Sequence, residues 1–170
     1  MAGDHPEPPR GVFVEDFVDV DASLEALRGS LLAGEGWLAP MAGAAERDGA
    51  TLLLRVGPAW AAERFQRDVR ARLGGYRTRH NGFVLWLWWE AAEHPSLFPV
   101  LDGDLEVAPL GDGRARLTLT ASYVPPLGVI GRGIDRAVLH RVAQSTVRSF
   151  LTRVAAAAVA RAAVPAERAD

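Results

Sequence analysis

The chain of 170 residues has the length of one domain and is long enough to bury a hydrophobic core. Hydrophobic residues make up 49% of it and charged residues 24%, the balance of an ordinary globular domain. A formal net charge of −2 excludes an overall basic field that would attract nucleic acid or an anionic membrane. The absence of cysteine excludes disulfide bonds, thiol catalysis and thiolate metal sites.

The two ends of the chain are predicted to be flexible, over residues 1–10 and 164–170. The first ten residues are polar and rich in proline, and they lack the apolar core of a signal peptide. No apolar run approaches the roughly 20 residues that a membrane span needs. We therefore expect a cytoplasmic protein that is not an integral membrane protein, with a single domain over residues 11–163.

The first elements predicted are a strand and one or two short helices. Loosely alternating valines predict a strand over residues 11–20. Asp21 is placed to cap a helix whose leucines recur at helical spacing as far as Leu32. A second short helix is expected over residues 37–45, with an interruption at Pro40.

From residue 49 the pattern changes to that of antiparallel strands. Strands are predicted at residues 50–56, 64–73, 82–90, 102–110 and 114–124. Gly74-Gly75 indicates a turn or bend, and Gly111-Asp112-Gly113 is a loop suited to positive φ that joins the last two strands in a hairpin. The arginines between residues 64 and 79 are interpreted as a solvated face, because exposed aromatic residues do not interleave them.

The last element predicted is a long amphipathic helix over about residues 134–163, which Pro165 ends. Its apolar stripe consists of Ile134, Val138, Val142, Val147, Phe150, Leu151, Val154 and Ala158. Helices that are segregated from a run of strands predict an α+β domain. We expect a helix-grip arrangement, in which a curved antiparallel sheet of six or seven strands wraps around the C-terminal helix.

Three segments carry a resemblance to a known family. They are Leu97-Phe98-Pro99-Val100-Leu101-Asp102-Gly103-Asp104-Leu105-Glu106, Tyr123-Val124-Pro125-Pro126-Leu127-Gly128, and Asp135-Arg136 with His140-Arg141-Val142-Ala143. With the order of elements, they make roughly residues 11–160 resemble the START-like, polyketide cyclase/dehydrase (SRPBCC) superfamily, especially bacterial members without assigned function. The resemblance implies the helix-grip fold. That superfamily includes lipid carriers, hormone receptors and cyclases, so the fold does not fix the function.

The stretch from Phe83 to Trp89 is apolar on both sides of the predicted strand. Phe83, Leu85, Leu87 and Trp89 share one side, and Val84, Trp86, Trp88 and Glu90 share the other. Either one side is core and the other packs under a loop or subunit, or one side lines a cavity with tryptophan as a stacking surface and N–H donor. An outward tryptophan face that stays exposed would serve a homodimer contact.

The leading hypothesis is a protein that binds a mostly apolar small molecule, such as a lipid, fatty acid, isoprenoid or polyketide, between the sheet and the last helix. The lining is predicted from positions that face inward on the strands and on the helix stripe. The candidates are Trp86 and Trp88 or their neighbours, with Phe98, Leu105, Leu117, Leu119, Tyr123, Val138, Val142, Thr146 and Phe150.

Two other classes of function stay open. The first is a cyclase or dehydratase that shapes a polyketide-like chain and uses an acid–base group, for which Tyr123, His140 and Glu90 are the candidates. The second is an interaction protein with a vestigial cavity and a tryptophan face that binds a partner. No cofactor and no metal site is expected, because the scattered histidines lack metal-ligand spacing and no phosphate-binding or dinucleotide-binding glycine motif occurs.

Overall fold

The computed structural model of the chain describes residues 12–32, 51–56, 67–93, 100–124 and 136–163. The strands are β1 (Val12–Val20), β2 (Thr51–Val56), β3 (Arg67–Arg79), β4 (Gly82–Ala91), β5 (Val100–Gly111) and β6 (Arg114–Val124). The helices are α1 (Leu24–Leu32) and α3 (Arg136–Ala162). The helix predicted over residues 37–45 and the two predicted flexible ends lie outside the described residues.

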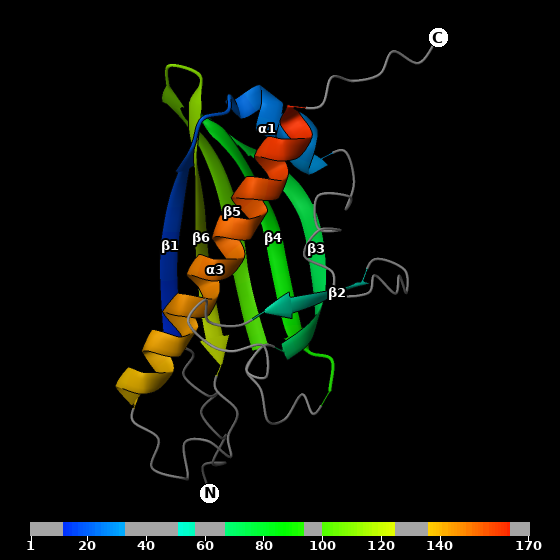
Figure 1. The fold of residues 1–170 in the computed structure, drawn as a ribbon, viewed down its shortest axis with the longest axis vertical. Coiled ribbons are helices and arrows are strands. Elements are labelled where there is room, and N and C mark those ends of the chain that lie inside the picture. The colour runs from blue at the N-terminus through cyan, green and yellow to red at the C-terminus, as the bar shows by residue number, and fades with distance from the viewer. Residues whose placement is uncertain (1–11, 33–50, 57–66, 94–99, 125–135, 164–170) are drawn as a thin grey trace, which may run out of the picture.

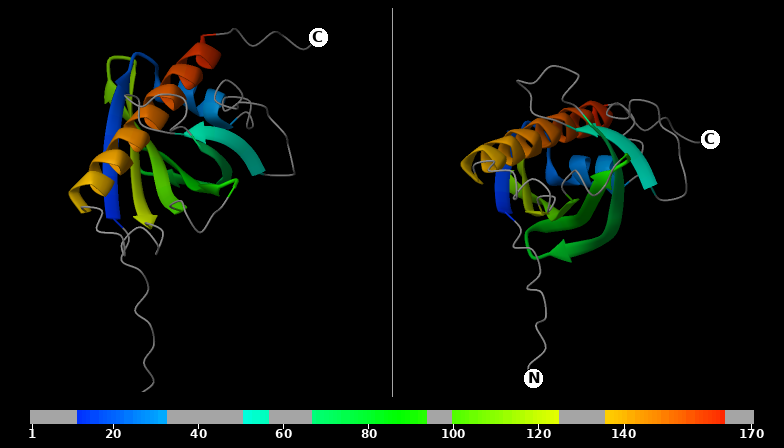
Figure 2. Two further views of the ribbon diagram at one scale, coloured as in Figure 1. Left: turned by 60° about the horizontal axis from the view of Figure 1, so that its bottom comes forward. Right: turned by 90° about the horizontal axis from the view of Figure 1, so that it is seen from below.

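The described strands form one antiparallel sheet in the order β1-β6-β5-β4-β3-β2. Each strand from β2 to β6 pairs with its neighbour in sequence, and β1 adds to the far side of β6. The sheet curves, and α3 lies diagonally across its concave side, as Figures 1 and 2 show. This architecture confirms the α+β class and the predicted helix-grip arrangement.

Glycines account for two irregular places in the sheet. At Gly111, Asp112 and Gly113 the backbone has φ values of 85°, 53° and 72°, so the predicted positive-φ hairpin loop is confirmed. Gly74-Gly75 does not end a strand. The pairing of β3 with β4 instead shifts its register between Leu73 and Tyr76, and β3 continues to Arg79. Such a bulge bends a strand without ending it, which fits the curvature of this sheet.

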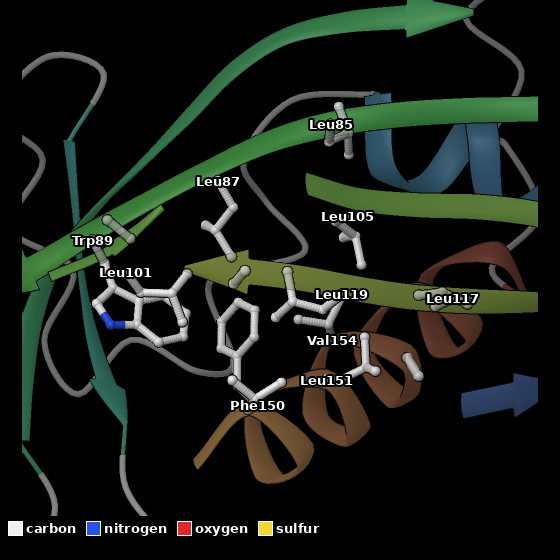
Figure 3. Close-up of a cluster of buried hydrophobic side chains, with 14 of the residues drawn as sticks. Leu85, Leu87, Trp89, Leu101, Leu105, Leu117, Leu119, Phe150, Leu151 and Val154 are labelled. Carbon is white, nitrogen blue, oxygen red and sulfur yellow. The ribbon is translucent and has the colours of Figure 1, made fainter. Parts of the chain in front are cut away.

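The core lies between the concave face of the sheet and α3. Figure 3 shows leucines of β4, β5 and β6 directed toward Phe150, Leu151 and Val154 of the helix. These three helix residues are almost completely buried. Residues three and four apart share one face of a helix, so the apolar stripe predicted for residues 134–163 is the face that packs on the sheet.

Helix α1 covers one end of this core and packs against the C-terminal half of α3. Its N-terminal cap is Ser23, whose Oγ accepts a hydrogen bond from the Ala26 N–H at 3.2 Å, so the cap predicted at Asp21 is wrong by two residues. The buried Ser30 Oγ donates to the Ala158 carbonyl at 2.9 Å. Alanines near this contact allow the two helices to approach closely.

Candidate functional site

Strand β4 presents Leu85, Leu87 and Trp89 to the helix. All three are buried in the core shared by sheet and helix. Trp89 meets Phe150 of α3 with ring centroids 4.9 Å apart and planes at 65°. At Trp89 the concave face is therefore occupied by side chains that touch across the sheet–helix interface (Figure 3).

Trp86 and Trp88 do not face the helix, which corrects the expectation that these two residues line the concave side. Both are half-buried on the opposite, convex face. The Trp86 Nε1–H donates to Asp102 Oδ1 at 2.7 Å, and the Arg72 guanidinium lies 5.3 Å from the centre of the Trp88 ring. Their neighbours Leu87 and Trp89 take the inward positions.

The other predicted lining residues of the sheet are on the helix-facing side. Leu105, Leu117 and Leu119 show no exposed surface, and they lie on β5 and β6 directly beneath α3. Phe150 of α3 is buried in the same core. Phe98 and the side chain of Val138 lie outside the described part of the structure.

One end of the concave face carries a polar group within an apolar row. The register places Trp89 beside Leu101 and Leu101 beside Tyr123, so the three residues form one row across β4, β5 and β6. Tyr123 is 9% exposed. Burial raises the pKa of its phenol to about 12, so the side chain stays protonated at neutral pH and is a hydrogen-bond donor.

The first half of α3 is less completely buried than the second half. Ala143 and Val147 are buried against the sheet, whereas His140, Val142 and Thr146 are half-buried. His140 lies seven residues before Val147, and residues seven apart fall on one helix face, so His140 belongs to the sheet-facing side. At these positions the first half of α3 therefore keeps both apolar and polar side chains partly exposed.

His140 and Tyr123 lie at the same end of the domain. Arg148 of α3 pairs with Asp16 of β1, with Nη1 2.9 Å from Oδ1. His140 lies two turns before Arg148, about 12 Å along the helix. Tyr123 pairs with Val12, four residues before Asp16 and about 13 Å along the strand. β1 and α3 run in the same direction from the same end of the domain (Figure 1). His140 and Tyr123 therefore lie at similar distances from the Arg148–Asp16 pair, toward that same end.

Glu90 does not share this end of the concave face. It alternates with Trp89 on β4 and lies beside Arg70 on the convex face. Asp102 and Asp104, the carboxylates of the family-like segment, also lie on the convex face, where Asp104 is 3.5 Å from Arg77 Nη2. Of the three acid–base candidates, only Tyr123 and His140 lie on the sides of sheet and helix that face each other. Glu90 points away from the helix, which corrects its prediction as a cavity residue.

Arg153 is not among the predicted site residues, because the predicted apolar stripe of the long helix does not include it. In the structure it is half-buried, and loss of hydration lowers the pKa of its guanidinium. It lies three residues after Phe150 and seven after Thr146, which places it on the same side of the helix as Thr146. This spacing could have indicated from the sequence that Arg153 shares a helix side with Thr146. The charge of the arginine instead favours a position in solvent.

Neither a metal site nor a membrane-spanning helix occurs in the part of the chain that the structure describes. Among these residues, no three histidine, aspartate or glutamate side chains come together in a way that could hold a metal ion. The described helices include none that is both long enough and apolar enough to cross a membrane.

Comparison with known proteins gives a likeness in structure alone. No protein-family model matches the sequence, and no curated protein matches it. A conserved protein from Geobacillus kaustophilus superposes with a TM-score of 0.58 at 14% identity, covering 88% of this chain and 96% of that one. The ZhuI aromatase/cyclase from Streptomyces sp. R1128 gives 0.57 at 16% identity, covering 91% and 98%.

Two further solved structures have the same architecture. A START superfamily protein from Mycobacterium smegmatis superposes with a TM-score of 0.54 at 16% identity, covering 88% of this chain and 96% of that one. Norcoclaurine synthase from Thalictrum flavum, in complex with dopamine and hydroxybenzaldehyde, gives 0.55 at 12% identity and covers 89% of each chain. Together with the sheet order and the long C-terminal helix, these likenesses show that the chain has the helix-grip fold that these structures share.

Proposed function

We propose that the chain binds a mostly apolar small molecule between the sheet and the first half of α3. The observation that carries this proposal is the change in burial along the helix. Phe150, Leu151 and Val154 are sealed against the sheet, whereas His140, Val142 and Thr146 in the first half of α3 remain half-buried. An apolar wall with a few convergent polar groups is the usual composition of a small-molecule site.

The polar groups of this end would orient the ligand rather than bind a charge. The protonated phenol of Tyr123 and the hydroxyl of Thr146 are neutral hydrogen-bond donors. The row that contains Trp89 and Leu101 is apolar and lies beside Tyr123, although both of these side chains are buried in the core. These features favour a ligand with a hydrophobic body and one or two carbonyl or hydroxyl oxygens, such as a polyketide, an isoprenoid or a fatty acid.

Structural neighbours support the same class of function. Dopamine and hydroxybenzaldehyde, which the neighbouring norcoclaurine synthase holds, are small aromatic molecules with hydroxyl groups. In this chain the phenol of Tyr123 and the apolar row beside it fit a molecule of that kind.

Native mass spectrometry of freshly purified protein tests the proposal. We expect adducts of a hydrophobic molecule that disappear on denaturation. Val142→Trp would fill the space above the concave face and reduce the adducts, and the matched control is Ala156→Trp, which adds the same side chain to an exposed position of α3. Equal adducts in both variants, or none in any folded preparation, would contradict the proposal.

A cyclase or dehydratase on a polyketide-like substrate is the second candidate. Tyr123 and His140 favour it, because they lie at the same end of the concave face and could serve as proton donor and acceptor. Incubation with a poly-β-keto thioester, followed by mass spectrometry of the products, tests it. We then expect Tyr123→Phe and His140→Ala to abolish cyclised or dehydrated products while ligand adducts persist. Unchanged substrate with the wild-type chain would exclude this activity for that substrate class.

A further inference from the structure

The convex face of the sheet carries charge in rows that follow the strands. On β3 the outward positions include four exposed arginines, Arg70, Arg72, Arg77 and Arg79, and the exposed Asp68 precedes them on the same face. On β5 the outward positions include three acidic residues: Asp102, Asp104 and Glu106. Between these rows lies β4, whose outward positions include the half-buried Trp86 and Trp88. Basic, aromatic and acidic rows therefore stand side by side.

The strand register aligns these rows level by level. Arg72 pairs with Trp88, and Trp88 pairs with Asp102, so these three residues share one level. Arg77, Val84 and Glu106 share a second level. Strands are about 4.8 Å apart, so a basic residue and an acidic residue of one level are separated by about 10 Å of backbone. Arg77 also reaches Asp104 across β4, with Nη2 3.5 Å from Oδ1, so at this level a second copy would exchange a pair within one chain for a pair between chains.

We propose that two copies of the chain associate through this face about a two-fold axis that runs along β4. Rotation about that axis places β3 of one copy over β5 of the other. It sets Arg72 against Asp102 of the second copy, and Arg77 against Glu106 of the second copy. An axis across the strands would set arginines against arginines, so charge selects the first arrangement.

The pattern fits a second copy better than another partner, because it is complementary to itself. A two-fold interface uses the same patch on both subunits, which requires opposite charges on the two sides of the axis. Trp86 and Trp88 meet their own counterparts on the axis, and aromatic residues within a charged rim are the usual composition of an interface centre. The acidic row of β5 would repel nucleic acid from the same face.

Glu90 does not oppose this arrangement. It lies on β4, one outward position beyond Trp88, and so approaches the proposed axis. Its cross-strand neighbour is the exposed Arg70, which compensates its charge. Convex faces touch along their middle strands only, so we expect a contact at the small end of the range for protein interfaces and a correspondingly weak, salt-sensitive dimer.

Sedimentation equilibrium of the full chain tests the inference independently of any ligand. We expect a dimer at high protein concentration that dissociates when the salt concentration is raised. Arg72→Glu and Asp102→Arg should each weaken association by about tenfold or more, because like charges then face one another. The double variant Arg72→Glu/Asp102→Arg exchanges the two rows at this level and should restore association.

Controls separate the interface from folding. Arg141→Glu reverses an exposed arginine of α3 on the other side of the molecule and should associate like the wild type. Each variant is first required to match the wild-type circular dichroism spectrum and denaturation midpoint. A wild-type chain that stays monomeric, single variants that associate normally, or a folded double variant that stays monomeric would each overturn the proposal.

Discussion

The indole ring of Trp89 meets the phenyl ring of Phe150 edge to face, with ring centroids 4.9 Å apart. Both side chains are almost completely buried, and an aromatic pair of this geometry contributes about 0.5–1.5 kcal/mol beyond the burial of its surface. The pair joins β4 to α3 in the row of the sheet that also contains Tyr123.

Phe150→Ala is expected to lower the free energy of unfolding by about 3–5 kcal/mol, because it removes a buried ring and leaves a cavity. Phe13→Ala is the matched control. Phe13 is 64% exposed on β1, so the same substitution there should change stability by about 0.5 kcal/mol or less. Urea denaturation of the two variants measures both values, and similar losses would contradict the burial that distinguishes the two positions.

Gly103→Ala is expected to destabilise the centre of the sheet. A Cβ at this position would lie 2.6 Å from the Ala121 Cβ and 2.6 Å from the Thr120 carbonyl oxygen, both on the neighbouring strand β6. Relief requires movement of the β6 backbone, which we expect to cost about 1–3 kcal/mol. Thermal or urea denaturation measures the loss.

Gly75→Ala is the control for that substitution. Gly75 also lies in a strand, but a Cβ there would meet nothing within 4 Å. Its effect on the free energy of unfolding should be near zero or slightly stabilising, because alanine restricts the unfolded chain by about 0.4–1 kcal/mol more than glycine does. A larger loss at Gly75 than at Gly103 would show that crowding between β5 and β6 is not the deciding factor.

Ser30→Ala should cost about 1 kcal/mol, because it removes a buried hydrogen bond between α1 and α3. The Ser30 Oγ donates to the Ala158 carbonyl at 2.9 Å. Ser122→Ala, at an exposed position of β6, is the control and should change stability by about 0.5 kcal/mol or less. Hydrogen exchange of the α1 amides would show whether the loss is local, and protection of α1 equal to the wild type would contradict a docking role for Ser30.

The fold could be predicted from the sequence because its strongest signals are local and repeated. The apolar stripe from Val147 to Ala158 indicated a long helix, and Gly111-Asp112-Gly113 indicated the hairpin at its correct place. Gly74-Gly75 left two alternatives open, because a glycine pair is typical both of a turn and of a bend within a strand. Only the continuation of pairing to Arg79 distinguishes the two, and that pairing is a tertiary property.

The orientation of β4 could not be predicted from β4 alone, because both of its sides are apolar. The pairing of β4 with the neighbouring strand β5 determines its orientation. Asp102 pairs with Trp88, whereas the buried Leu101 pairs with Trp89. Unpaired carboxylates are seldom buried, so correct pairing of β4 with Asp102 and Asp104 of β5 would have put Trp86 and Trp88 on the convex face. What the sequence lacked was the register between the two strands.

The stability of the protein should fall steeply in alkaline solution because of Tyr123. Burial raises the pKa of its phenol to about 12, whereas a tyrosine in an unfolded chain has a pKa of about 10. The folded state holds the proton more tightly, so this contribution to stability is complete below pH ~10 and is lost as the pH rises from about 10 to 12. The expected loss at the end of this range is about 2–3 kcal/mol.

Tyr123→Phe separates this effect from other alkaline effects, because the variant keeps the ring and lacks the ionisable hydroxyl. Urea denaturation of both proteins at several pH values between 8 and 12 gives the difference in their free energies of unfolding. That difference should be constant up to about pH 10 and then shift in favour of the variant. If the two proteins lost stability in parallel throughout this range, Tyr123 would ionise as an exposed tyrosine does and could not be the buried donor proposed for the ligand site.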